Sequence, residues 1–158
     1  MKFLDRINKL FEQIGMIFIV LMILIISIQV FSRYFFSVTP RWSEEVALLL
    51  MVWFAFIGIS IGVKRESHLS IEYFVSLLPE KIQKVIIRFG HVLVLFSGLF
   101  LFYYGGLLAI QTRTSTLPAT RLPSSYLYIM VPIAGFLIFL YSIPKVLGKT
   151  EVLKEEKE

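Results

Sequence analysis

The chain has 158 residues, of which 57% are hydrophobic and 17% charged. A soluble domain carries about 25% charged residues, so this composition excludes a water-soluble globular protein. It is typical of a chain whose solvent is the lipid bilayer. The net charge of +5 does not indicate nucleic-acid binding, because the basic residues lie between apolar segments and form no single patch. The absence of cysteine excludes disulfides, thiolate metal sites and cysteine nucleophiles.

Four segments without Asp, Glu, Lys or Arg at their centres are long enough to cross a membrane. A helix needs about 17 to 25 apolar residues to span about 30 Å of hydrocarbon, and an alternating pattern typical of barrel strands is absent. We therefore predict an all-α integral membrane protein with a four-helix domain at 13–148. Its spans are expected at residues 13–32, 43–63, 84–112 and 122–144.

The residues before the first span, 1–12, predict a short amphipathic helix in the membrane plane. Apolar side chains recur there at helical spacing, opposite Lys2, Arg6 and Lys9, a pattern suited to the acidic inner surface of a membrane. A cleaved signal peptide is the alternative for the first span that follows this leader. Its apolar core is too long for that, however, and acidic residues interrupt the basic leader.

The loop at 66–79 predicts a second amphipathic element, ended by Pro79, which is alternatively the first residue of the next helix. From Glu80 to Thr112 nothing interrupts the helical pattern. A helix of about 33 residues would be about 50 Å long, so it must tilt or project from the inner face. Residues 149–158 form a charged tail.

Twelve of the 16 Lys and Arg residues lie in the N-terminal segment, the middle loop and the C-terminal tail. The other four are Arg33, Arg41, Arg113 and Arg121. Because positive charge stays on the cytoplasmic side, we expect both termini and the middle loop to lie in the cytoplasm.

The second span begins with a polar block, residues 39–45. As a helix start it would have Thr39 or Ser43 as the cap and Pro40 at the first position. Glu44 and Glu45 would either favour the positive end of the helix or make a polar contact between helices or subunits. They would otherwise pair with Arg33 or Arg41, while Trp42 would anchor at the outer interface.

Gly58 and Gly62 stand four residues apart in the same span, a spacing that lets another helix approach closely. Packing within the chain's own bundle is favoured over packing against a partner. Trp53 lies in the middle of the span, away from the interfaces where aromatic residues gather, and this position indicates helix packing.

No ionisable side chain that a proton relay or ion gate would need lies at the centre of a predicted span. His68 and His91 stand alone, and no phosphate loop, carboxylate pair or nucleophile–base spacing is present. We therefore predict a protein that is not an enzyme and that takes neither metal nor cofactor.

Several short blocks of sequence are distinctive when they are taken together. They are Arg33-Tyr34-Phe35, Trp42-Ser43-Glu44-Glu45, Trp53 with Gly58, Lys64-Arg65 with His68, the turn at Leu117-Pro118-Ala119, and Pro123, Tyr128 and Pro132. In this combination the chain resembles the DctQ-type small membrane subunit of tripartite ATP-independent periplasmic (TRAP) transporters. Glu72, Ser70 and Arg121 depart from the common pattern, which puts the transfer of partner specificity through the outer loop in doubt.

The resemblance implies a multi-pass protein of the bacterial cytoplasmic (inner) membrane. Its partners would be membrane lipid, the large TRAP membrane subunit, which carries the substrate and sodium sites, and an extracytoplasmic solute-binding protein. The complex would import organic acids of the sialic acid or C4-dicarboxylate type by sodium-coupled symport. The small subunit would enlarge the stationary scaffold of the large one.

With this assignment we expect structural roles for the polar and small residues of the second span. Arg33, Trp42, Glu44 and Glu45 would act at the outer interface, Gly58 and Gly62 would allow close helix approach, and Lys64, Arg65 and His68 would fix the inner end. Two other classes compete with it: a self-assembling channel or small stand-alone transporter, and a membrane assembly factor without a transport role.

Overall fold

The computed structural model describes residues 2–64 and 79–146, and these residues are almost entirely helical. The described residues include four helical segments that are long and apolar enough to cross a membrane, namely Arg6–Phe36, Arg41–Lys64, Lys81–Thr114 and Ser125–Val146. The prediction of an all-α protein with four spans is confirmed. The charged tail and all of the loop at 66–79 except Pro79 lie outside the described residues.

The first helix, α1 (Lys2–Phe36), has 35 residues and continues without a break past residue 12. The structure thus has one helix where the sequence suggested an in-plane helix followed by a span, and the in-plane orientation of residues 1–12 stays a prediction. α1 ends where Ser37 adopts a left-handed φ of 52°, a conformation that terminates many helices. The Ser32 hydroxyl donates to the Val38 carbonyl at 2.8 Å across this turn.

A proline immediately precedes both α2 (Arg41–Lys64) and α4 (Glu80–Gln111). The Pro40 carbonyl accepts hydrogen bonds from the Ser43 N–H at 3.2 Å and the Ser43 hydroxyl at 2.6 Å. The Pro79 carbonyl accepts from the Ile82 N–H at 2.9 Å. Each proline therefore lies one residue before the first helical residue, and not at the first helical position that was predicted for Pro40 and considered for Pro79. Ser43 donates to a carbonyl instead of capping an N–H.

The third span confirms the prediction of one long uninterrupted helix. α4 has 32 residues, which corresponds to about 48 Å at the rise of an α-helix. This length exceeds the roughly 30 Å of hydrocarbon, so α4 must tilt or extend beyond the hydrocarbon.

A hairpin-like loop joins α4 to the fourth span. After a single 3₁₀ turn, η1 (Thr112–Thr114), the Leu117 N–H donates to the Leu122 carbonyl at 2.8 Å, and Arg121 takes a left-handed φ of 57° at the tip. The fourth span comprises α5 (Ser125–Tyr128) and α6 (Met130–Val146). It begins later than the predicted residue 122, because the loop pairing holds the residues before Ser125.

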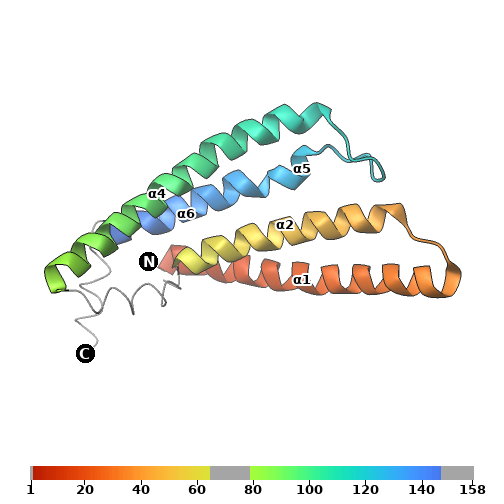
Figure 1. Cartoon of the computed structure of the whole chain (residues 1–158), viewed down its shortest axis with the longest axis horizontal. Coiled ribbons are helices and arrows are strands. Elements are labelled where there is room, and N and C mark those ends of the chain that lie inside the picture. Colours follow the sequence, from red (N-terminus) through yellow and green to blue (C-terminus); the bar gives the residue numbers. More distant parts are fainter. Residues whose placement is uncertain (1, 65–78, 147–158) are drawn as a thin grey trace.

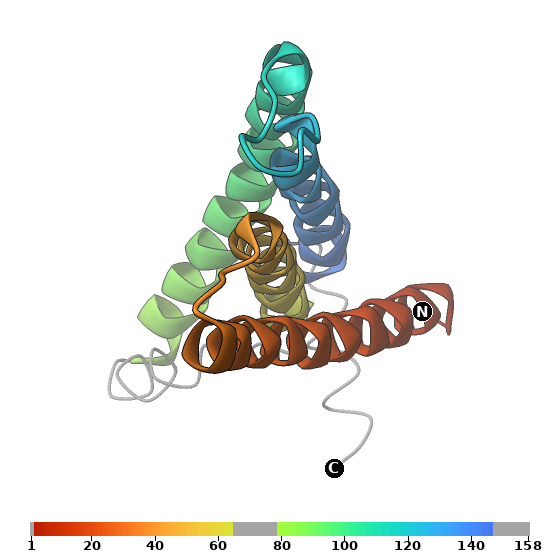
Figure 2. The ribbon, with the colours of Figure 1, turned by 90° about the vertical axis from the view of Figure 1, so that its right-hand side faces the viewer.

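The four spans form two pairs that meet through α2 and α6. α1 packs on α2, α4 packs on α6, and α2 contacts α6 between the pairs (Figure 1). Figure 2 shows α1 crossing α2 at an angle, so its two ends diverge from the other helices. In their most apolar stretches, 44% of the fourth span is buried but only 6% of the first and third. α6 is therefore the centre of the fold, while α1 and α4 present apolar side chains outward.

α4 and α6 come into close contact at glycines. A Cβ atom on Gly135 would lie 2.5 Å from the Phe102 backbone nitrogen, and one on Gly98 would lie 2.8 Å from the Phe139 nitrogen. A Cβ on Gly105 would lie 2.7 Å from the Val131 side chain. Because hydrocarbon provides little hydrophobic drive for association, close packing of this kind is a main source of helix pairing in membranes.

We expect Gly135→Ala to destabilise the protein by about 1–3 kcal/mol, because the new methyl group forces α4 and α6 apart. Gly106→Ala is the matched control, since a Cβ at Gly106 meets nothing within 4 Å. Thermal unfolding of both variants in the same detergent checks the difference. Equal unfolding temperatures for the two variants would contradict the close contact.

Candidate functional site

Glu45, in the first turns of α2, holds the loop between α4 and α5. Its carboxylate accepts hydrogen bonds from the Ala119 N–H at 2.7 Å, the Thr120 N–H at 2.7 Å and the Thr120 hydroxyl at 2.6 Å. Figure 1 shows this loop reaching toward the start of α2. We call Glu45, Ala119 and Thr120 the outer polar cluster.

The local fold explains this geometry. The pairing of Leu117 with Leu122 and the left-handed Arg121 close the loop, so that two consecutive N–H groups, those of Ala119 and Thr120, reach one carboxylate. Hydrogen bonds to an ionised acceptor are shorter and stronger than neutral ones. The cluster therefore ties the N-terminal end of α2, which we predict to be the outer end, to the connection between the third and fourth spans.

Glu44 makes a separate contact, with α1. It accepts a hydrogen bond from the Gln29 side-chain amide at 3.2 Å. Within residues 2–64 and 79–146, neither Glu44 nor Glu45 forms an ion pair with Arg33 or Arg41. The ion pairs that the sequence allowed for these two acids are therefore not seen. The predicted contact between helices is found, and it lies inside this chain.

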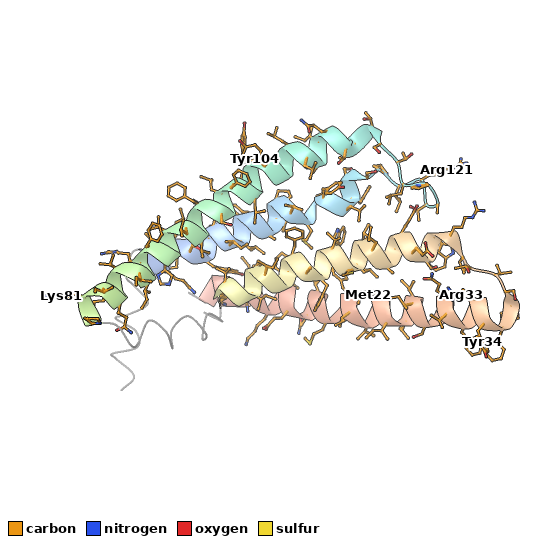
Figure 3. The ribbon with its side chains drawn as sticks, in the orientation of Figure 1. Met22, Arg33, Tyr34, Lys81, Tyr104 and Arg121 are labelled. Atoms are coloured by element: carbon orange, nitrogen blue, oxygen red, sulfur yellow. The ribbon has the colours of Figure 1, made fainter. Side chains whose placement is uncertain are left out.

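The outer residues Arg33 and Trp42 are exposed, with 47% of the Trp42 surface accessible. Figure 3 places Arg33 and Arg121 at one end of the molecule and Lys81 at the other. This separation agrees with the unequal distribution of charge in the sequence. The assignment of the Lys81 end to the cytoplasm stays a prediction.

Trp53 bridges three helices from the middle of α2. Its indole N–H donates to the Tyr126 carbonyl in α5 at 2.9 Å. Its ring lies 5.5 Å from the Phe18 ring of α1, measured between centroids. The expected role in helix packing is therefore found, and the indole N–H of the half-buried Trp53 has a hydrogen-bond partner on another helix.

At the opposite end, lysines join α2 to α6. The Lys64 ammonium lies 5.7 Å from the centroid of the Tyr141 ring, and the Lys145 ammonium donates to the Val63 carbonyl at 2.6 Å. A lysine at a helix C-terminus also interacts favourably with the helix dipole. Lys64 thus helps to fix the C-terminal end of α2, and the location of that end on the inner side of the membrane stays a prediction. Arg65 and His68 lie outside the described residues.

Gly58 and Gly62 do not mark a close approach of another helix within the described residues. A Cβ atom at either position would meet nothing within 4 Å in the described part of the chain. The described residues therefore do not show the packing within the chain's own bundle that we expected at these glycines. The glycines that serve this purpose are Gly98, Gly105 and Gly135, which sequence reasoning did not single out.

Gly58 instead borders an open hollow between α1 and α2. The hollow has a volume of about 370 Å³, and Glu12 lies at its edge. Its lining residues are Glu12, Gly15, Met16, Phe54, Ile57, Gly58 and Ile61. Among the described residues no three His, Asp or Glu side chains gather in a way that could hold a metal ion.

These features define a four-span helical membrane protein whose polar side chains hold its helices and its outer loop together. Residues 22–151 match the family of tripartite ATP-independent periplasmic transporters, DctQ component, and the chain belongs to that family. It is a multi-pass protein of the bacterial inner membrane, in a family of transporter subunits that is not a known enzyme family.

Three relatives illustrate the similarity. A Haemophilus influenzae protein assigned as a TRAP transporter small permease is 29% identical over 148 residues, 92% of this chain and 90% of that protein. The Vibrio cholerae sialic acid TRAP transporter small permease protein SiaQ is 25% identical over 147 residues, 93% of this chain and 85% of SiaQ. The Haemophilus influenzae sialic acid TRAP transporter permease protein SiaT is 32% identical over 133 residues, which are 84% of this chain but only 21% of SiaT.

We expect Glu45→Ala to loosen the outer loop, because the Ala119 and Thr120 N–H groups lose their acceptor. Hydrogen exchange at these two amides should accelerate by roughly tenfold. Glu44→Ala is the control, since Glu44 contacts Gln29 and not the loop. Exchange measured by mass spectrometry in detergent checks this, and unchanged protection of residues 119–120 in Glu45→Ala would show that other contacts hold the loop.

Proposed function

We propose that this chain is the scaffold partner of a large TRAP permease in the sodium-coupled, binding-protein-dependent import of an organic acid. In this arrangement the large permease carries the substrate and sodium sites, and an extracytoplasmic binding protein delivers the ligand. The small permease adds fixed helices to the large one. Both termini of the small subunit lie in the cytoplasm.

The observation that carries the proposal is an uncovered face of α2. Leu48, Met51, Ala55, Gly58 and Gly62 follow one another three or four residues apart, so they share one side of the helix. The Leu48 and Met51 side chains are 51% and 59% exposed, and no atom within 4 Å restricts a Cβ at either glycine. We call these five residues the open face of α2. Small residues beside larger apolar ones suit the close approach of another membrane helix.

The relative SiaT supports the identity of that partner. This chain matches about a fifth of SiaT, so a segment of its kind can be part of one longer permease polypeptide. Two proteins that are separate in one case and continuous in another are expected to contact each other in both. The rest of the permease is therefore the natural occupant of an apolar face that this chain leaves uncovered.

The buried hydroxyl groups support a scaffold role over a channel. Ser60 donates to the Ile57 carbonyl and Ser142 to the Ile138 carbonyl, each at 2.8 Å within its own helix. A hydroxyl used in this way does not line a path for ions or solutes, which needs polar groups directed into it. Two open hollows among the described residues, one along α1 and one between α1 and α2, have mainly apolar linings.

The transported acid belongs to the sialic acid or C4-dicarboxylate class. Relatives of this chain include small permeases named for each of the two substrates. Similar small subunits thus serve different acids, which agrees with selection by the large permease and the binding protein.

Reconstitution tests the proposal. We expect sodium-driven uptake of a radiolabelled sialic acid or C4-dicarboxylate only when vesicles contain both this chain and a partner large permease, with binding protein outside. Uptake by this chain alone would support a stand-alone transporter or channel. Failure to form a stable complex under any condition would favour an assembly factor.

Substitutions on the open face of α2 test whether this face contacts the large permease. Gly58→Leu with Gly62→Leu should weaken co-purification with the large permease by about tenfold, because the added side chains prevent close approach. The isolated chain should keep its unfolding temperature, since both positions are open. Gly106→Leu, at an open glycine of α4, is the matched control and should retain the complex.

A further inference from the structure

The first third of α4 extends beyond the length that hydrocarbon can cover. α4 measures about 48 Å at the α-helical rise, compared with about 30 Å of hydrocarbon. Figure 1 shows the start of α4 projecting past the end of α6. If the other end of α4, next to the outer loop, lies at the outer interface, the first turns of α4 reach the inner headgroup region.

These turns carry two different, adjoining faces. Lys81, Lys84 and Arg88 follow one another three and four residues apart, so their side chains share one side of the helix. The next side carries four exposed apolar residues. They are Ile82, Val85, Ile86 and Phe89, with exposed fractions of 47%, 68%, 37% and 62%. We call residues 81–89 the basic segment of α4.

The side chains of Lys81, Lys84 and Arg88 are all exposed. Among the described side chains, which do not include those of residues 2–5 and 80, none forms a hydrogen bond or ion pair with these three cations. Lys81 lies at the extreme end of the helix, away from the other spans (Figure 3).

Neither water nor hydrocarbon suits this segment alone. Four exposed apolar side chains on consecutive turns are unfavourable in water, and three cations are unfavourable in hydrocarbon. The boundary between headgroups and acyl chains accommodates both, because long basic side chains reach outward while the apolar side enters the membrane. Acidic headgroups also complement a cluster of positive charge.

We propose that the basic segment of α4 binds acidic phospholipids of the inner leaflet. Lys81, Lys84 and Arg88 contact the phosphates, while Val85 and Phe89 lie among the upper parts of the acyl chains. This lipid site does not depend on the proposed transport function, since all its groups belong to α4. It gives the transporter a requirement for acidic lipid at the inner end of its third span.

Photo-crosslinking of the full chain tests the proposal. The chain is reconstituted in phosphatidylcholine vesicles that contain a trace of either photoactivatable phosphatidylglycerol or photoactivatable phosphatidylcholine. Mass spectrometry then maps the crosslinks. We expect residues 81–89 to react preferentially with phosphatidylglycerol, and the preference to fall by about fivefold for each cation that is neutralised to Gln.

Two variants separate lipid binding from a general effect of charge. Lys81→Arg with Lys84→Arg should keep the preference, and neutralising Arg33, Arg113 and Arg121 at the other end should leave it unchanged on residues 81–89. An equal reaction with both lipids, or a preference that survives Lys81→Gln, Lys84→Gln and Arg88→Gln together, would overturn the proposal. The crosslinks should also persist in the complex with a large permease, and their loss there would assign this face to a protein partner.

Discussion

The contact between α4 and α6 at Gly98 and Gly135 is the interaction on which the rest of the structure depends. Lipid chains are as apolar as the helices, so burial alone gives these helices little reason to associate. Close backbone approach supplies packing contacts, and the missing side chains make that approach possible. α6 becomes the most buried span as a result, and α2 then packs against its other side.

Polar contacts at both ends of α2 complete this arrangement. At one end Glu45 holds the loop that connects the α4–α6 pair, and at the other Lys145 of α6 donates to the Val63 carbonyl. Polar groups lose the least hydration free energy at the ends of spans, where water and lipid headgroups still solvate them. Between these two ends, the Trp53 indole holds one side of α2 to the Tyr126 carbonyl, while the open face lies uncovered on another side of the helix.

Much of the fold could be predicted from the sequence, because a long apolar segment without charge is stable in few arrangements other than a membrane-spanning helix. The uninterrupted α4 was also predictable, since no proline lies between Glu80 and Gln111 and the charged residues of this helix are confined to its first turns. The hydrogen-bond partners of Glu45 could not be predicted, because a loop far away in the sequence positions the Ala119 and Thr120 N–H groups. The spacing of Gly58 and Gly62 pointed to α2, whereas the close contact that the structure describes lies between α4 and α6. Gly98 and Gly105, seven residues apart on one face of α4, were the available signal for the true contact.

The central claim is that the open face of α2 is covered by the large permease. The most direct test places a photoreactive benzoylphenylalanine at Met51, which is 59% exposed in the isolated chain, and irradiates membranes that contain the assembled transporter. The account predicts a covalent adduct between this chain and the large permease. Adducts with lipid alone, from a complex that still co-purifies intact, would contradict it.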